Sequence, residues 1–362
     1  MATTPQQDLT AINNYAGQYE QRIRTSIFNG LDIATDLNLI TNLTAPRIMP
    51  KYKANEGLRP YDVDVVDPDG QAGTFSQRTI VPRTAMKILR VVPEELRKTY
   101  LSEMLKANAP DYPQGFAQYF WDEQIKKQRA EINNNSYFGV DGQLIPVYDG
   151  GTVYAVDARV RYANSYFKCL AITTAGQSPE SHPAKWQKVN NSSINKGLGT
   201  IIADEYAALP ARNKIATGTI DATNAFDKVT NFYLAIPEEI RNLGGIIRCS
   251  RSTYDNYNMS ALAKFTNGTS FLDIAGANGK VIGKSIFGSD GKWILQPASW
   301  MSGSKRLVAD VDKNLYFGTD LTSDFTSIGQ MIPFVHGYTC KMQLVLAFQI
   351  ADLDILFVND QA

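Results

Sequence analysis

The stretch Met342-Gln-Leu-Val-Leu-Ala-Phe-Gln-Ile350 is the most regular pattern in the chain. Large apolar side chains occupy every second position, which is typical of a β-strand with one buried face. After Asp352 the alternation resumes from Leu353 to Phe357 and predicts a second strand. The whole of 291–358 is predicted to be rich in strands, the others being Trp293–Pro297, Arg306–Asp310 and Asn314–Phe317.

Residues 195–290, immediately upstream, alternate between helical and strand-like patterns. The short apolar run Ile246–Ser250 predicts a buried strand, and 252–265 predicts a helix after it. This alternation favours helices packed on a sheet. A further amphipathic helix is predicted from apolar residues at helical spacing, namely Ala225, Val229, Phe232, Tyr233 and Ile236.

The longest predicted helix covers 115–133. Trp121, Ile125 and Ile132 fall on one stripe, so one face of this helix is predicted to be buried. We expect the helix to end near Asn133–Asn135. Upstream, Pro93-Glu-Glu-Leu96 has the proline and acidic residues of a helix start.

Residues 47–90 predict a long hairpin. Tyr61, Val63 and Val65 alternate with polar residues, Asp67–Gly73 is a turn cluster, and Phe75–Val81 predicts the returning strand. The strands offer little apolar surface, and an isolated two-stranded hairpin is marginal in water. The hairpin therefore needs a surface to lie on, supplied either by its own domain or by another subunit.

Residues 144–190 are predicted to form a separate small insertion that is dense in aromatic side chains. Three short strands are predicted within it, with glycine-rich turns between them: Val153–Val156, Val160–Tyr162 and Tyr166–Ala171.

Composition excludes several classes of protein. The chain has 36 Lys and Arg against 36 Asp and Glu, and this balance argues against a dedicated binder of nucleic acid or anionic membranes. A membrane span needs about 18 apolar residues, and no run approaches this length. The start of the chain lacks the basic and apolar regions of a signal peptide, so none is expected.

Few residues are suited to catalysis or metal binding. His182 and His336 are isolated, and the three cysteines are far apart, so neither a zinc site nor a disulfide framework is predicted. Asp352 and Asp354 are either a general acid/base pair or, more simply, a solvated strand edge. We predict no enzyme activity, cofactor or metal. Two glycine motifs are incomplete as nucleotide-binding loops: Gly197-Leu-Gly199 and Gly283-Lys-Ser285.

The order of these patterns resembles that of tailed-bacteriophage major capsid proteins with the Hong Kong 97-type fold. The resemblance covers nearly the whole chain outside 144–190. The stretches that carry it are Phe75–Arg83, Pro93–Leu96 with the helix 115–133, Gln296–Trp300, Asn314–Asp320 and Phe348–Ile355.

The resemblance implies an α+β fold with an N-terminal arm, an extended loop, a peripheral domain with a long spine helix, and an axial domain. On this chain the insertion is additional and all-β. The implied ranges are 1–46 for the arm, 47–90 for the loop hairpin, 91–143 and 291–362 for the peripheral domain, 144–190 for the insertion and 191–290 for the axial α/β domain.

The resemblance also implies partners and a location. The chain is expected to assemble with itself into pentamers and hexamers of an icosahedral shell around double-stranded DNA, which it contacts non-specifically. Portal and scaffolding proteins are expected, a membrane is not, and the location implied is the virion capsid, assembled in the bacterial cytoplasm. The Met1 start favours a separate scaffold or none. Residues expected at contacts between subunits are Arg47, Asp69, Gly70, Arg78 and Arg83.

The insertion contains Asp157-x2-Val160-x-Tyr162-x3-Tyr166, followed by Gly176-x2-Pro179 and Trp186-x2-Val189. These patterns are similar to those of small chitin- and cellulose-binding modules. The resemblance implies that Tyr162, Tyr166 and Trp186 contact a surface polysaccharide. The alternative is that these aromatics form the core of the module itself, because so small a domain needs them there. For the whole chain, the alternatives to a capsid protein are an encapsulin-like compartment and a carbohydrate-binding protein.

Overall fold

The computed structural model describes a chain in which strands and helices are mixed. The described residues are 31–54, 73–91, 114–265, 273–275, 281–311, 314–320, 327–328, 332–334 and 337–361. The predicted start of a helix at Pro93, the strand at Tyr61–Val65 and the turn containing Asp69 and Gly70 lie outside these residues.

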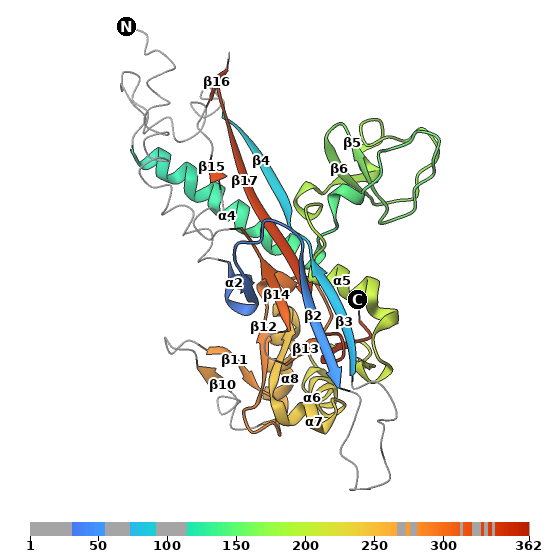
Figure 1. Ribbon diagram of the computed structural model, residues 1–362, viewed down its shortest axis with the longest axis vertical. Coiled ribbons are helices and arrows are strands. Elements are labelled where there is room, and N and C mark those ends of the chain that lie inside the picture. Colours follow the sequence, from blue (N-terminus) through green and yellow to red (C-terminus); the bar gives the residue numbers. More distant parts are fainter. Residues whose placement is uncertain are drawn as a thin grey trace, which may run out of the picture.

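The α+β class predicted from the sequence is confirmed, and the described elements follow the predicted order (Figure 1). The helices are α2 (Asp32–Asp36), α4 (Gln114–Phe138), α5 (Leu198–Glu205), α6 (Ala225–Leu234), α7 (Glu238–Leu243) and α8 (Arg251–Lys264). The strands are β1 (Asn38–Ile40), β2 (Arg47–Ala54), β3 (Gly73–Ile80), β4 (Arg83–Val91), β5 (Arg159–Tyr162), β6 (Ser165–Cys169), β7 (Trp186–Lys188), β8 (Lys214–Ile215), β9 (Gly245–Cys249), β10 (Asp273–Ala275), β11 (Val281–Ser285), β12 (Trp293–Pro297), β13 (Val308–Asp310), β14 (Leu315–Gly318), β15 (Ser327–Ile328), β16 (Ile332–Phe334), β17 (Gly337–Ile350) and β18 (Leu356–Asn359).

The first sheet is organised around β17, the strand predicted from the alternating C-terminal stretch. β4 pairs with β17 antiparallel, from Arg83 opposite Leu346 to Val91 opposite Tyr338. β14, β15 and β16 also pair with β17, and β1 extends the sheet beside β14. The alternating side chains of β17 are buried in one core with the apolar stripe of α4, as both patterns predicted.

The second sheet has the strand order β10-β11-β12-β9-β13-β18-β8. β9 lies inside it, parallel to β12 and antiparallel to β13. α6 and α8 pack together and share a second core with this sheet, which includes Phe232 and Tyr257. The amphipathic helices predicted at 225–236 and 252–265 are therefore confirmed.

At β13 and β18 the second sheet is buried on both faces, because this part of the sheet lies between the two cores. On β13, Val308 belongs to the core of α4 and β17, whereas Ala309 belongs to the core of α6 and α8. Val358 and Phe357 divide in the same way on β18. Adjacent residues of a strand point to opposite faces, so these two strands join the two cores.

The strands divide differently from the predicted ranges. β12, β13 and β18 lie within 291–362, yet they pair in the sheet of β9 rather than with β17. Conversely, α5 lies within 191–290 but packs in the core of α4. The reason is that β9 is buried and needs a paired strand on each side, and those strands come from the C-terminal part of the chain.

α4 continues five residues past the predicted end at Asn133. Asn135 is fully buried, and its Oδ1 accepts hydrogen bonds from the backbone N–H groups of Ile194 and Asn195 at 3.2 and 3.4 Å. Tertiary contacts thus override the weak helix propensity of the asparagines. The helix ends at Phe138, one residue before Gly139.

The N-terminal arm is described only from residue 31, and its described part is fixed to the body by Asp36, the last residue of α2. The Asp36 carboxylate accepts hydrogen bonds from Gln296 Nε2 at 2.8 Å and from Trp300 Nε1 at 3.1 Å. The Asp36 carbonyl accepts one from Arg248 at 2.8 Å, and Arg248 also pairs with the buried Asp310. These contacts tie the arm to the second sheet, and the pairing of β1 with β14 ties it to the first sheet before the hairpin begins.

The insertion stands beside the body as a separate three-stranded unit (Figure 1). Two of its predicted strands are confirmed as β5 and β6. The strand predicted at Val153–Val156 is wrong, and the third strand is β7, which starts at Trp186 and pairs with β6. Its buried core consists of Val160, Cys169 and Trp186.

Candidate assembly surface

The hairpin of β2 and β3 is the element that the sequence singled out for contact with neighbours. Its strands pair antiparallel from Arg47 opposite Ile80 to Ala54 opposite Gly73. Of the 8 residues in each strand, only Ile80 is buried, and it packs with Leu43 at the base of the hairpin. Because apolar burial is this limited, the position of the hairpin depends on polar contacts with the rest of the chain.

Arg78 attaches β3 to the end of β17. Its Nε donates a hydrogen bond to the carbonyl of Ile350 at 2.6 Å. A terminal guanidinium nitrogen binds the carboxylate of Glu205 at 2.7 Å and the side-chain oxygen of Gln349 at 3.0 Å. Gln349 in turn donates from Nε2 to the carbonyl of Thr79 at 2.8 Å. Hydrogen bonds to charged groups are stronger than those between neutral groups, so this cluster fixes the part of the hairpin near its base.

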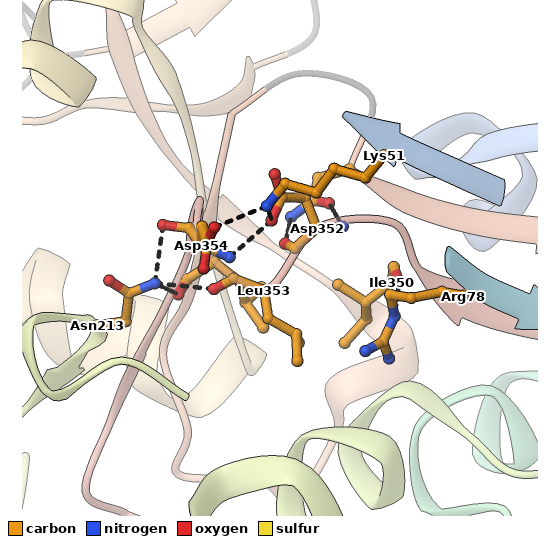
Figure 2. A network of polar contacts seen from close by, with 9 residues as sticks. Lys51, Arg78, Asn213, Ile350, Asp352, Leu353 and Asp354 are labelled. Atoms are coloured by element: carbon orange, nitrogen blue, oxygen red, sulfur yellow. Dashed lines mark hydrogen bonds and ion pairs between the residues drawn. The ribbon is translucent and has the colours of Figure 1, made fainter. Parts of the chain in front are cut away.

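Lys51 attaches β2 to the turn between β17 and β18. Its Nζ lies 2.5 Å from an oxygen of Asp352 and 2.7 Å from an oxygen of Asp354, and Figure 2 shows the amine between the two carboxylates. The acidic pair predicted as an acid/base pair or a solvated edge thus has a third role, which is to bind the hairpin. We call Lys51, Asp352 and Asp354 the latch.

The turn that carries the two carboxylates is itself held in place (Figure 2). Asn213 Nδ2 donates to the backbone carbonyls of Leu353 and Asp354 at 2.8 and 2.9 Å. The side chain of Asn314 exchanges two hydrogen bonds with the backbone of Asp352, at 2.7 and 2.9 Å. The carboxylates are therefore presented to Lys51 on a backbone that other elements fix.

The latch also changes the pKa values of Lys51 and Asp354. Burial, the largest single influence on Lys51, lowers its pKa, but the hydrogen bonds and charges of Asp352 and Asp354 outweigh burial, and the net pKa of Lys51 is raised. The hydrogen bond from Lys51 holds the pKa of Asp354 below its usual value. Both shifts favour the charged forms, so the latch is an ion pair near neutral pH.

Arg83, at the start of β4, ties the base of the hairpin to the insertion. Its Nε and a terminal nitrogen both contact one carboxylate oxygen of Asp141, at 3.0 and 2.6 Å. Asp141 also accepts a hydrogen bond from the backbone N–H of Gln143, which fixes the chain as it enters the insertion. Hairpin, sheet and insertion are thus joined at one ion pair.

The end of the described hairpin that lies beyond Lys51, away from its base, exposes apolar side chains. Tyr52 and Phe75 face each other across the strands with ring centroids 4.7 Å apart, yet they are 51% and 78% exposed. Ile48, lower on β2, is 54% exposed. Aromatic side chains supply much of the energy of protein interfaces, so this surface suits contact with another protein.

The structure divides the five predicted contact residues. Arg47 is exposed at the start of β2, whereas Asp69 and Gly70 lie outside the described residues. Arg78 and Arg83 are engaged within their own chain, because each finds a carboxylate there. Both side chains therefore hold the hairpin within the subunit, and their role at a contact between subunits stays a prediction.

Sequence reasoning did not find Lys51, Tyr52 or Phe75 as functional residues. Tyr52 and Phe75 are the only aromatics in β2 and β3, and this could have marked them once the register was known. Lys51 and its partner Asp352 are 301 residues apart, so no local pattern connects them.

The candidate sugar-binding aromatics of the insertion do not form an exposed platform. Trp186 is 5% exposed and its Nε1 donates to the carbonyl of Gln177 at 3.0 Å, so its ring belongs to the core of the module. Tyr162 is half-buried, with its hydroxyl bonded to Glu180 at 2.9 Å. Tyr166 is also half-buried. Only the tyrosines remain accessible in part, and the aromatic core is the reading that the geometry favours.

Within the described residues we find no group of three His, Cys, Asp or Glu side chains that could hold a metal ion. The helices of the same residues include none with the length and apolarity needed to cross a membrane. All three cysteines are free and buried, and burial raises the pKa of the thiol of Cys340. A buried, protonated thiol is a poor nucleophile, so this cysteine is not reactive.

No family model and no curated protein matches the chain by sequence. Its fold is similar to those of several solved shells. A chain of the satellite phage P4 procapsid aligns with TM-score 0.48 and 11% identity, over 94% of this chain and 90% of that one. The capsid of the myovirus XM1 aligns with TM-score 0.47 and 9% identity, over 91% of both chains. An encapsulin of Synechococcus elongatus aligns with TM-score 0.44 and 9% identity, over 92% and 88%.

Proposed function

We propose that this chain is a major capsid protein that assembles as pentamers and hexamers into an icosahedral shell around double-stranded DNA. The observation that carries the proposal is the division of the hairpin. The part near its base is fixed to its own subunit by Arg78 and Lys51, whereas Tyr52 and Phe75, further from the base, are exposed. Such an element is suited to reach a neighbouring copy of the chain.

The physical argument rests on what each part of the hairpin contributes. The anchored part sets the direction of the strands, so little conformational entropy is lost when the upper part meets a neighbour. Apolar side chains that are exposed in the subunit lose contact with water only when a partner covers them. Repeated around a ring, this contact would link each subunit to the next, as closed symmetric assemblies require.

The zero net charge of the chain supports a shell whose inner wall binds DNA only weakly. Each additional phosphate contact would add affinity through counterion release and slow the movement of DNA. We propose contact with DNA that is non-specific, assembly in the bacterial cytoplasm, and portal and scaffolding proteins as partners.

The insertion is proposed to project from the outer face of the shell. It has its own core and joins the body through two chain segments, next to Asp141 and Ser192. If Val147–Val189 is replaced by a short Gly/Ser linker, we expect shells that lack density only on the outside. Density lost from the inner wall would contradict this placement.

The proposal is tested by electron microscopy of the expressed chain, with and without its scaffold. We expect regular closed shells or capsomers from the parent chain, and their loss when Tyr52 and Phe75 are both changed to Ser. Ile172→Ser, which alters an equally exposed apolar residue on the insertion, is the control and should still assemble. A parent chain that stays monomeric with scaffold present would refute the proposal.

An encapsulin-like compartment is the second candidate, because its subunits would need the same contacts between copies. The capsid and the compartment are distinguished by the contents of particles that are isolated from cells carrying the gene and treated with nuclease. Protected double-stranded DNA supports a capsid, whereas an enclosed enzyme without DNA supports a compartment.

A further inference from the structure

A cavity of about 560 Å³ lies where the insertion meets the body. Its wall combines the end of α4 at Tyr137 and Phe138, residues Lys168 and Lys188 of the insertion, and Thr200 of α5. A volume of this size is typical of sites for small molecules. The cavity is separate from the hairpin and does not depend on the proposed function.

The charged side chains that line this cavity are all basic, and the nearby acidic side chain of Asp157 stands outside the lining. Four lining residues are basic, namely Arg159, Lys168, Lys188 and Arg306, and none of the lining residues is acidic. Lys168 pairs with Asp157 at 2.7 Å, but that carboxylate is itself 72% exposed. Lys188 is exposed and has no ion pair among the described residues. Basic walls without acids concentrate anions in a concave site.

Arg306 is the strongest single indication of an anion. It is 7% exposed, its Nε donates to the backbone carbonyl of Gln361 at 3.0 Å, and its guanidinium lies 5.9 Å from the ring centre of Tyr206. Within the described residues no carboxylate lies within ion-pair distance of it. A buried cation without a counter-charge is costly, and an anion in the cavity would remove that cost.

Arg159 has a related arrangement on the insertion side. One terminal nitrogen donates to the carbonyl of Ser192 at 2.7 Å and to the hydroxyl of Ser193 at 3.2 Å, and the other contacts the carbonyl of Phe138 at 3.5 Å. These partners are neutral, and burial lowers the pKa of the guanidinium. The two arginines come from different parts of the molecule and line one cavity.

We propose that this cavity binds a small anion that carries a phosphate group. Arg306 and Arg159 would bind the phosphate oxygens, since a guanidinium matches their geometry. Lys188, at the rim of the cavity, would neutralise the remaining negative charge of the phosphate. The side-chain amides of Asn134 and Gln187 and the hydroxyl of Thr200 can donate hydrogen bonds to further oxygens of the anion. The apolar side chains of Phe138 and Val189 can cover an organic part of the ligand. A bound phosphate would link the insertion to the body.

The experiment titrates the full chain with inorganic phosphate and with adenosine monophosphate, at constant ionic strength and with chloride as the reference. We expect a saturable rise in the melting temperature with at least one of the two, and calorimetry then gives the affinity. Binding of the nucleotide alone would identify the ligand as an organic phosphate. The inference is overturned if neither raises the melting temperature above chloride.

Variants connect any binding to the cavity. Lys188→Ala should weaken binding by about tenfold, the usual scale for one charge-assisted contact. Lys292→Ala, an exposed lysine of the loop before β12, is the matched control and should bind as the parent does. Arg306→Gln should weaken binding further, provided that circular dichroism shows an intact fold. Equal losses in Lys188→Ala and Lys292→Ala, or a salt-sensitive response only to a DNA duplex, would show general attraction to anions and refute the site.

Discussion

The hairpin and the insertion are both additions to the same two-sheet body, but they are stabilised in different ways. The insertion buries Val160, Cys169 and Trp186 around one another. Among the described residues of its two strands, the hairpin buries only Ile80, at its base, and it depends on Arg78 and Lys51 for its position. The insertion is therefore a module that folds on itself, whereas the hairpin is an element whose contacts lie outside it.

This difference matters for what each can do in an assembly. A module with its own core can be displayed on a surface without changing the subunit beneath it. A hairpin without a core can change partners, because each polar anchor at the base acts separately from the exposed aromatic surface above. The predictions that follow test whether the two regions are as distinct as their contacts indicate.

The largest effect is expected from Trp186→Ala in the insertion. The ring is 5% exposed, and truncating such a residue costs about 3–5 kcal/mol of folding free energy. Hydrogen exchange should show lost protection in 144–190 and unchanged protection in α4 and β17. Equal loss of protection in the body would show that the insertion is not an independent module.

A smaller effect is expected from Arg78→Met in the hairpin. The change removes hydrogen bonds to Ile350, Glu205 and Gln349, and hydrogen bonds of a charged group contribute about 1.5–3 kcal/mol. Protection should fall in β2 and β3 only. Arg47→Met is the matched control, because Arg47 is exposed and has no ion pair within the described residues. If both variants behave alike, Arg78 is not an anchor.

Local periodicity explains how much of the fold could be predicted from the sequence. The faces of α6, α8 and β17 follow from the spacing of apolar residues. The bounds of α6 and α8 were found within two residues, whereas β17 ends at Ile350 as predicted but begins at Gly337, five residues before the predicted start at Met342. The end of α4 was missed because Asn135 is buried against a loop some 60 residues away. The third strand of the insertion was missed because β7 has only 3 residues, too few to show a pattern.

The candidate site was predictable only in outline. Poor self-burial of 47–90 identified the hairpin as an assembly element, and the described strands have that property. Which side chains serve contact and which serve anchoring could not be deduced, because that depends on long-range pairs. Arg78 was expected to face a neighbour, and Asp352 and Asp354 were expected to be either a general acid/base pair or a solvated strand edge. The turn that brings Asp352 and Asp354 to Lys51 appears only when both sheets are assembled.

The smallest effect concerns the pH dependence of the latch. The pKa of Asp354 is lowered in the folded chain, so its stabilising contribution is complete above the unfolded value of about 4. That contribution is lost as the pH falls through the lower folded pKa. The pKa of Lys51 is raised, so its contribution is complete below its ordinary value of 10.5 and lost only as the pH rises through the higher folded pKa. The latch is therefore intact from about pH 4 to about pH 10.

Acidification below pH 4 should consequently release β2 near Lys51 while the core of the insertion, which contains no ion pair, stays closed. Hydrogen exchange, corrected for the intrinsic effect of pH, should show a selective loss of protection in 47–54 in the parent chain. Lys51→Met should show that loss already at pH 7 and no further step on acidification. Arg47→Met, on the same strand and without an ion pair among the described residues, should follow the parent. A step of equal size in Lys51→Met and the parent would mean that other carboxylates control the hairpin. The contrast between an anchored hairpin and a self-contained insertion would then have to be explained by Arg78 alone.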